Sequence, residues 1–447
     1  EFWKHGSVCE DYADIECAVY AVGGWADGYS NVIPRLLEGL SCPRKGLIGP
    51  WSHSWPNTAL PGPAIGFLQE ALRWWDRWLK GIDTGVEDDP DYRAYLMDGM
   101  RPATWTHERP GRWITEPTGA TSHLPVKTLH LTDEGLQDTA APLDRSVASP
   151  AHCGADGGEY CAIWLGPEMP GDQRQDDALS VCFDSGPLAQ QMDILGAPRL
   201  RLRLACDKPQ GQIAVRLNHI HPDGASARIT YGVLNLSHRD SAEHPQAMAP
   251  GAMTDITLDL DHIAYRIPKG HRLRVSISTA YWPLLWPAPE AAEVTLSSGQ
   301  IDLPQRPTSG GDEYSFAPPT SAAPWETETL RPENHIRRQE IDRVTGIVSL
   351  IIEDDFGKLR DADHGLIAGS VAREVWRIHP DDPLSAKGTC HWTEELERDD
   401  IILRTETRSQ MWSDATHFHL TARLEAYEND KLIYERDVTE DIKRHFM

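Results

Sequence analysis

The chain has 447 residues, of which 40 % are apolar and 25 % are charged, and its formal net charge at pH 7 is −25. A surface this acidic repels a phosphate backbone, which argues against nucleic acid as a partner. No run approaches the ~18 consecutive apolar residues of a membrane-spanning helix, so the sequence predicts a globular protein without a membrane segment, long enough for about three domains.

Eight cysteines are spread along the chain, without a Cys-x-x-Cys pair and without histidines at zinc-finger spacing. A structural zinc site is therefore not expected. A chain of this size does not need disulfides to fold, so we expect reduced thiols and a cytoplasmic enzyme. The sequence starts at Glu1 rather than at a methionine, so any targeting signal is expected upstream of it.

The first ninety residues alternate between strand and helix signals. The apolar run 17–23 predicts a buried parallel strand, a helix capped at Ser30 or Asn31 follows, and 45–49 predicts a second strand. A longer helix is predicted over 63–80. Its apolar stripe consists of Ile65, Leu68, Leu72, Trp75 and Leu79, and its three tryptophans (Trp74, Trp75 and Trp78) are expected to pack rather than to bind substrate. This order of elements is typical of a parallel sheet covered by helices.

The pattern changes after Asp91, and the later strands alternate between apolar and polar residues. Residues 199–204 alternate Arg and Leu without a break, and Leu273, Val275 and Ile277 alternate with polar neighbours. Several such strands separated by turns predict an antiparallel sandwich or jelly roll.

A proline-rich passage between residues 283 and 324 is too interrupted for regular structure and is interpreted as a linker or a surface wrap. Strand signals resume beyond about residue 335. They cover 347–352, 372–378, 401–407, 417–427 and 432–436, and Glu428 to Lys431 is a predicted hairpin turn.

The motif that carries chemistry is Gly-Gly-Trp-Ala-Asp-Gly-Tyr-Ser over 23–30, followed by Gly-Pro-Trp-Ser-His over 49–53. In α/β-hydrolases the triad acid and base stand on loops after successive late strands, in the order Ser, Asp, His. Asp27 follows the first predicted strand and His53 follows the second. The acid must touch its base to hold the imidazole in one tautomer, so we predict about 2.6 to 3.2 Å between their heavy atoms.

These strings, together with the tryptophan-rich helix, His-Pro-Asp-Gly at 221–224 and Pro-Lys-Gly-His-Arg-Leu-Arg-Val-Ser-Ile-Ser at 268–278, resemble the CocE/NonD family of serine hydrolases. This family includes cocaine esterase, α-amino acid ester hydrolases and Xaa-Pro dipeptidyl-peptidases. The resemblance covers about residues 1–305. It implies that Asp27 and His53 are the catalytic acid and base, and that Trp25, Tyr29 and Trp51 line the substrate pocket.

The resemblance also implies three domains. Residues 1–90 are expected to be the C-terminal part of an α/β-hydrolase domain, with 1–11 as the tail of its cap. Residues 91–330 are expected to form a galactose-binding-like jelly-roll domain similar to the C-terminal domain of Xaa-Pro dipeptidyl-peptidases, ending in the proline-rich linker. Residues 331–447 are expected to be a β-rich extension to which the sequence gives no chemical role.

The chain departs from the family pattern in one respect, because it contains no Gly-x-Ser-x-Gly elbow. We therefore expect a C-terminal fragment that is inactive alone, with its nucleophile and part of its oxyanion hole upstream. Ser52 and Ser54 flank His53 but lack the elbow that would aim them at the imidazole. The pairs His219/His221 and His417/His419 share strand faces, but without a third ligand they favour turn and surface positions over metal binding.

The sequence thus predicts a serine hydrolase that cleaves ester or amide bonds through an acyl-enzyme, with esterase or dipeptidyl-peptidase activity. Its partner would be a small ester, amide or peptide substrate, and neither a metal nor an organic cofactor is expected. Esterase, α-amino ester hydrolase, β-lactam acylase and dipeptidyl-peptidase are not separated, and homo-oligomerisation is left open. The competing hypothesis is a non-catalytic jelly-roll binding module.

Overall fold

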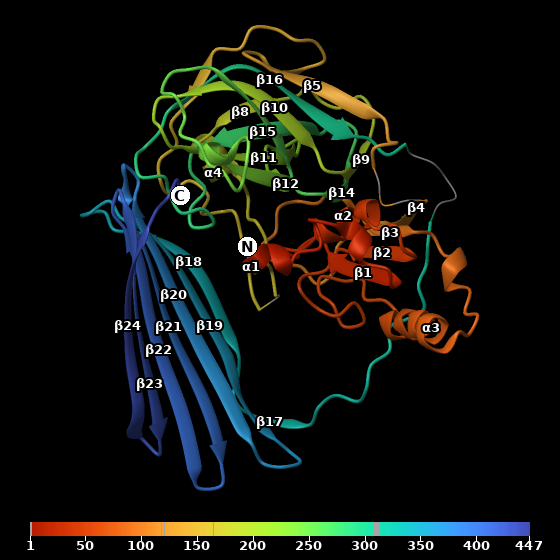
Figure 1. Cartoon of the computed structure of the whole chain (residues 1–447), viewed down its shortest axis with the longest axis vertical. Coiled ribbons are helices and arrows are strands. Elements are labelled where there is room, and N and C mark those ends of the chain that lie inside the picture. The colour runs from red at the N-terminus through yellow and green to blue at the C-terminus, as the bar shows by residue number, and fades with distance from the viewer. Residues whose placement is uncertain (1, 118, 120, 164, 308–312) are drawn as a thin grey trace.

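The computed structural model of the chain describes residues 2–117, 119, 121–163, 165–307 and 313–447, and strands make up most of its regular structure (Figure 1). Glu1, where the expected cap tail starts, lies outside these ranges. The described helices are α1 (Phe2–His5), α2 (Val32–Gly39), α3 (Phe67–Lys80) and α4 (Arg174–Ala178), and the 3₁₀ turns are η1 (Tyr12–Asp14), η2 (Val86–Asp88) and η3 (Leu236–His238).

Within the described ranges, no helix combines the length and the apolar character needed to cross a membrane.

The first sheet contains the two strands that precede the Asp27 and His53 loops. Its strand order is β1-β2-β3-β14-β9, and β4 pairs with the other side of β3. The pairs β1–β2, β2–β3 and β3–β14 are parallel, whereas β9 and β4 pair antiparallel with their neighbours. The apolar face of α2 packs on this sheet through Ile33 and Leu37. The strands are β1 (Val19–Gly24), β2 (Arg44–Gly49), β3 (Tyr92–Asp98), β4 (Gly111–Glu116), β9 (Met192–Gly196) and β14 (Ile263–Ile267).

This first sheet continues beyond the expected domain boundary at residue 90. Strand β3 is buried along nearly its whole length and pairs in parallel with β2, so it extends the sheet instead of starting a new one. Strands β9 and β14 then join from far downstream. The expected boundary at residue 90 lies where the sequence pattern changes, and it does not coincide with the edge of this sheet.

Helix α3 turns a different face inward from the one its apolar stripe predicts. Leu72, Trp75 and Leu79 are 58 %, 54 % and 74 % exposed, while Glu70 and Trp74 are buried. The reason is the neighbouring strand: Glu70 accepts a hydrogen bond of 2.8 Å from the buried Arg93 of β3. A buried arginine needs a carboxylate, and this requirement fixes the rotation of the helix.

Two antiparallel sheets face each other and enclose the largest apolar core. One has the order β13-β10-β16-β5-β6 with β7 on β16, and the other has the order β12-β11-β15-β8. The strands of the first are β5 (Val126–Thr132), β6 (Gly135–Gln137), β7 (Arg145–Val147), β10 (Arg199–Cys206), β13 (Thr254–Asp259) and β16 (Val294–Pro304). Those of the second are β8 (Val181–Asp184), β11 (Gln212–Ile220), β12 (Ser226–Asn235) and β15 (Arg272–Ser278).

The predicted alternation of β10 is confirmed. Leu200, Leu202 and Leu204 are at most 3 % exposed and belong to this core, whereas the arginines between them face solvent. Each buried leucine contributes about 1.5–3 kcal/mol relative to an exposed one. The arginines pair with aspartates on the neighbouring strands, as in Arg199 with Asp259.

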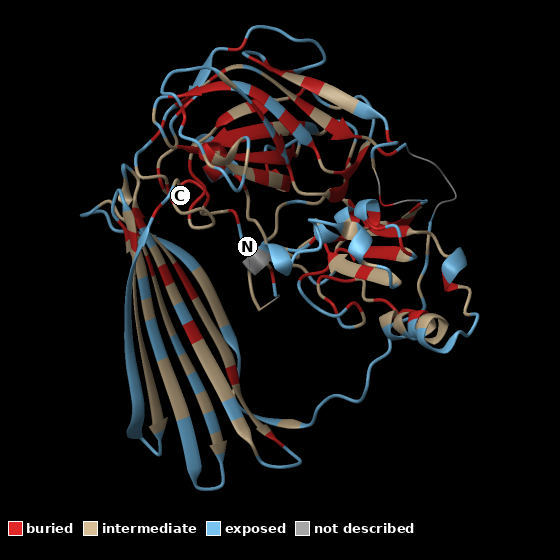
Figure 2. Cartoon of the chain, viewed as in Figure 1, coloured by how far each residue is buried: buried red, intermediate tan, exposed pale blue. Residues whose placement is uncertain are grey.

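The fourth sheet is an antiparallel meander that extends away from the rest of the chain (Figure 1). It includes a strand, β21, that the sequence analysis did not predict. Its face with Arg408 and Arg423 carries ion pairs, among them one of 2.8 Å to Glu425, and most of its residues are intermediate or exposed (Figure 2). Its strands are β17 (Thr327–Arg331), β18 (Asn334–Ile341), β19 (Val348–Asp361), β20 (Ile367–His379), β21 (Asp382–Arg398), β22 (Ile401–Ser413), β23 (His417–Glu428) and β24 (Lys431–Lys443).

One end of the fourth sheet is attached to the body of the molecule by a small apolar cluster. Ile378 and Ala386 pack with Ala151 and Trp282, and Trp376 lies against them. The Trp286 indole N–H also donates a hydrogen bond of 3.0 Å to the Ser413 hydroxyl. The end of the sheet thus packs on the body, and Arg337 within β18 adds an ion pair of 3.3 Å to Glu159.

The proline-rich passage includes a segment that wraps along the first sheet. Phe316 packs on Trp113 of β4 with 4.8 Å between ring centroids, and the Tyr314 hydroxyl accepts a hydrogen bond of 3.0 Å from the Arg93 guanidinium. Gly66 donates its backbone N–H to the Ala317 carbonyl over 2.7 Å. The sequence left a linker and a surface wrap as interpretations of this passage, and residues 313–318 form a surface wrap.

Candidate active site

The loops that follow β1 and β2 lie side by side at one edge of the first sheet. Gly24 and Gly49, the last residues of the two strands, are register partners. A Cβ on Gly24 would lie 2.1 Å from the Trp51 carbonyl oxygen, so only glycine permits this approach. Asp27 and His53, a few residues further along each loop, are thereby brought together.

The Asp27 carboxylate contacts the His53 imidazole directly. Asp27 Oδ2 lies 2.9 Å from His53 Nδ1, within the range predicted from the sequence. A carboxylate only accepts, so Nδ1 carries the hydrogen and Nε2 carries the lone pair. The side chain of Asp27 is 11 % exposed and that of His53 is 55 % exposed. Nε2 has no hydrogen-bond partner among the described residues, which leaves it free to accept a proton.

A loop from outside the first sheet holds this pair in place. The His53 backbone N–H donates to the Ala162 carbonyl over 2.7 Å, and the Ala162 N–H donates to the Ala26 carbonyl over 3.3 Å. The Cys161 thiol donates to Asp27 Oδ1 over 3.7 Å, and that oxygen also accepts the Tyr29 N–H over 2.9 Å. Burial and the nearby Asp27 carboxylate raise the pKa of Cys161, so it is a neutral donor to the acid. Nothing in the sequence indicated this contact.

The three predicted pocket aromatics lie in different environments. Tyr29 is 61 % exposed, and its ring centroid is 5.8 Å from that of His53. Trp25 donates its indole N–H to the Tyr95 carbonyl and lines a cavity next to Asp27. Trp51 is 1 % exposed and packs on Trp113 in the core, with its N–H bound to the Pro63 carbonyl.

The cavity next to Asp27 has a volume of about 150 Å³ and lies between the first sheet and strand β12. Its lining mixes apolar and charged groups, including Arg228, Asp261 and Glu159. Burial raises the pKa of Asp261 and of Glu159, although Asn31 and Arg337 partly counter this by hydrogen bonding. A polar ligand bound there would lie beside Asp27.

The serines next to His53 do not complete a triad. Ser52 is 2 % exposed, and its hydroxyl has no hydrogen-bond partner within the described ranges. The Ser54 N–H donates to the Ser52 carbonyl, which is a local turn contact. Neither hydroxyl is hydrogen-bonded to the imidazole among the described residues.

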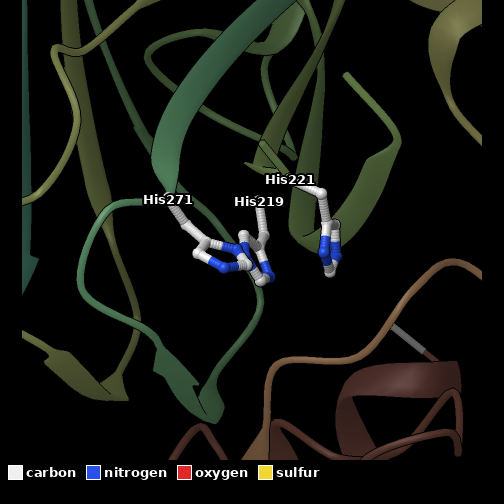
Figure 3. Close-up of side chains that lie close together, drawn as sticks. All are labelled: His219, His221 and His271. Atoms are coloured by element: carbon white, nitrogen blue, oxygen red, sulfur yellow. The ribbon is translucent and has the colours of Figure 1, made fainter. Parts of the chain in front are cut away.

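The two histidine pairs differ in a way that the sequence did not reveal. His219 is completely buried, and His271 lies beside it and His221 (Figure 3). The surface position favoured for His219 is therefore wrong, because β11 is buried along its whole length. His419 is held instead by Asp414 and Asp441 on the fourth sheet.

Comparison with known families matches most of the chain. A family model described as the X-Pro dipeptidyl-peptidase C-terminal non-catalytic domain matches residues 84–318, more than half of the chain. A second, described as X-Pro dipeptidyl-peptidase (S15 family), matches residues 1–55.

Individual relatives agree with these matches. A putative serine esterase of Mycobacterium bovis is 26 % identical over 319 residues, which cover 64 % of this chain and 50 % of the relative. Cocaine esterase of Rhodococcus sp. is 22 % identical over 311 residues, covering 63 % and 52 %. The chain thus spans about half the length of the curated relatives it matches.

Solved structures show the likeness in fold. A CocE/NonD family hydrolase from Staphylococcus aureus superposes with a TM-score of 0.52 at 12 % identity, covering 69 % of this chain and 57 % of that protein. An aminopeptidase from a marine sediment archaeon of the Thaumarchaeota superposes with a TM-score of 0.51 at 14 % identity, covering 68 % and 60 %.

Proposed function

Since the chain belongs to the family of X-Pro dipeptidyl-peptidase C-terminal domains, we propose that it works as part of a serine hydrolase in which Asp27 and His53 are the catalytic acid and base. Its relatives include serine esterases and an Xaa-Pro dipeptidyl-peptidase by name. The observation that carries the proposal is the hydrogen bond of 2.9 Å between Asp27 Oδ2 and His53 Nδ1, with Nε2 bound by no other described residue.

The proposed chemistry follows from this tautomer. His53 Nε2 takes the proton of a serine hydroxyl as the serine oxygen attacks the acyl carbon of an ester or amide. Asp27 stabilises the imidazolium that results. The same proton then passes from Nε2 to the leaving alcohol or amine, and a water molecule repeats the sequence to release the acid and free the serine.

The nucleophile in this proposal comes from outside the 447 residues, because no Gly-x-Ser-x-Gly elbow occurs in them. Residues 1–90 would belong to an α/β-hydrolase domain and 91–330 to a jelly roll. The parallel pairing of β1 with β2 supports the first assignment, with β3 extending the same sheet past residue 90, and the two facing antiparallel sheets support the second. Residues 331–447 would be an added β-rich unit.

The substrate class proposed is a small ester, amide or peptide. The cavity of about 150 Å³ next to Asp27 supports a small acyl group, and its charged lining supports a polar one. A second candidate function is a non-catalytic binding module, which the description of the matched family as a non-catalytic domain favours for residues 84–318.

The experiment compares residues 1–447 with a longer protein extended upstream through a Gly-x-Ser-x-Gly elbow. We expect the longer protein to hydrolyse p-nitrophenyl esters and to react with a fluorophosphonate probe, and residues 1–447 alone to do neither. Removing the nucleophile leaves at best ~10³ to 10⁴-fold catalysis over water. Stoichiometric labelling of residues 1–447, retained after His53→Ala, would place the active site elsewhere.

Asp27→Asn in the longer protein tests the acid. The amide cannot stabilise the imidazolium and permits the wrong tautomer, so kcat should fall by ~10⁴-fold with little change in KM. Asp138→Asn is the matched control, because the Asp138 side chain is 74 % exposed and pairs only with Lys127 among the described residues. Equal activity of the two variants would show that Asp27 is not the catalytic acid.

A further inference from the structure

Three histidines converge where strands β11 and β15 meet the first sheet (Figure 3). His219 lies near the end of β11, His221 follows that strand, and His271 immediately precedes β15. The antiparallel register pairs Ile220 with Arg272 and so places the two strand ends side by side. One ring nitrogen from each histidine lies within 4.8 Å of the other two.

Hydrogen bonding fixes the tautomer of His221. Its Nε2 lies 3.0 Å from the Met100 carbonyl oxygen, which can only accept, so Nε2 carries the hydrogen. Nδ1 of His221 is therefore a lone-pair donor. Histidines that bind metals usually donate their other N–H to a carbonyl in this way.

His219 and His271 point nitrogens at each other. His219 Nε2 lies 2.6 Å from His271 Nδ1, and between two neutral rings only one hydrogen can occupy this contact. The other nitrogen of His219 lies 3.1 Å from the Tyr265 hydroxyl, which can donate or accept. Burial and the two neighbouring rings lower the pKa of His219 to about 3, so it is neutral at neutral pH.

We propose that His219 Nε2, His221 Nδ1 and His271 Nδ1 form a binding site for a divalent first-row transition metal, with zinc as the best fit. Zinc binds imidazole nitrogens at about 2.0–2.1 Å in tetrahedral geometry, which sets the ligand nitrogens about 3.3 Å apart. The His219–His271 contact must open by about 0.7 Å from its 2.6 Å, and His221 must close in. His271 is half-exposed and can move, and water would take the fourth position.

Metal binding to three neutral rings needs no net release of protons. His219 shifts its hydrogen to Nδ1, where the Tyr265 oxygen accepts it, and His271 holds its hydrogen on Nε2. Every ring stays neutral, so the hydrogens are rearranged and none is lost. Tyr265 and Met100 then support the ligands from behind, as in known sites.

The surroundings select the class of metal. The three donors are imidazoles without a carboxylate, and the Arg109 guanidinium lies over the Tyr265 ring at 5.8 Å. Nitrogen donors disfavour Mg²⁺ and Ca²⁺, which require oxygen ligands. Bound metal would connect β11 and β15 of one sheet to the first sheet through Tyr265 and Met100.

The other histidine pair provides an internal contrast. Both ring nitrogens of His419 are already held by carboxylates, Asp441 at 2.6 Å and Asp414 at 3.1 Å. The rings of His417 and His419 are 6.4 Å apart. Sequence spacing is the same in the two pairs, but only His219 and His221 have a third histidine beside them in the described ranges.

The test uses residues 1–447 stripped of metal with a chelator and titrated with Co²⁺. We expect one cobalt per chain with the visible absorption of a tetrahedral site, displaced by Zn²⁺ and not by Mg²⁺. His271→Ala and His221→Ala should each weaken binding by ~100-fold or more, since removing even a supporting contact costs 10–100-fold. His417→Ala should leave binding unchanged.

Two further controls make the result decisive. Asp27, His53 and Cys161 are the other metal-capable group in the described ranges, and His53→Ala removes it without touching this site. Zn²⁺ should raise the melting temperature of the wild-type chain and not that of His271→Ala, because it binds only the folded cluster. If His271→Ala fails to fold, His271→Gln replaces it. Absence of uptake, or uptake that survives the His271 substitution, would overturn the proposal.

Discussion

At the scale of single residues, buried histidines link stability to pH. Burial and the nearby Arg35 lower the pKa of His262 to about 4, and the pKa of His219 is lowered to about 3. In an unfolded chain both would titrate near ~6.5. Between these values the unfolded state binds more protons, so folding stability is complete above about pH 6.5 and is lost as the pH falls. Asp156 acts in the opposite sense, because burial and Asp176 raise its pKa to about 6.

We therefore expect the urea midpoint of unfolding to decrease from pH 7.5 to pH 4.5. His262→Gln should make this decrease shallower, because the substituted side chain no longer binds a proton on unfolding. His5→Gln, at an exposed position, should leave the slope as it is. The measurement is urea denaturation followed by fluorescence at several pH values. If the urea midpoint of His262→Gln fell with pH as steeply as that of the unchanged chain, proton binding by His262 on unfolding would be contradicted.

At the scale of elements, the attachment of the fourth sheet includes a small cluster of apolar side chains. Ile378 is fully buried among Ala151, Trp282 and Ala386, so Ile378→Ala should cost ~2–5 kcal/mol locally. Hydrogen exchange of the β19 and β20 amides should accelerate, while that of β10 should not. Ile433→Ala on β24, where the side chain is 52 % exposed, is the matched control. Equal exchange in the two variants would show that the strand ladder alone holds the sheet.

The sequence patterns predicted where strands and helices lie better than they predicted which residues those elements contact. The Asp27 and His53 loops could be predicted because each follows a short strand, and neighbouring strands of a parallel sheet end at one edge. The stripe of α3 was detected, but periodicity does not reveal what covers a face, and the buried Arg93 draws Glu70 inward instead. Cys161 and His271 reach their sites through loop placement and strand register, which local sequence does not encode.

Strand β21 escaped prediction for a related reason. Its second half is rich in charged residues, and the side chains there alternate between intermediate and exposed, so no buried face marks it. It is held by backbone pairing to β20 and β22 on both sides. In a sheet that is open to solvent, a strand is defined by its backbone pairing with adjacent strands, and its own residue pattern does not reveal it.

At the scale of the whole molecule, all eight cysteines are free thiols. Titration of the denatured, unreduced chain should therefore count eight. In the native chain we expect Cys9 and Cys17 to react first, since they are exposed, and Cys153 to react last. Burial raises the pKa of Cys153 to about 12 and so removes the reactive thiolate. A count clearly below eight in denaturant would contradict the free-thiol structure.

The strand order β1-β2-β3-β14-β9 also has a kinetic consequence. The meander β19–β24 pairs neighbours along the chain, and such local contacts close short loops at little entropic cost. The first sheet instead inserts β14, from residues 263–267, between β3 and β9, and so must wait for a long loop to close. During synthesis, the edge that carries Asp27 and His53 leaves the ribosome before β14 does, and it gains its complete sheet only after residue 267 has followed. Asp27 and His53 are thus made well before the last strand of the sheet that fixes them in place.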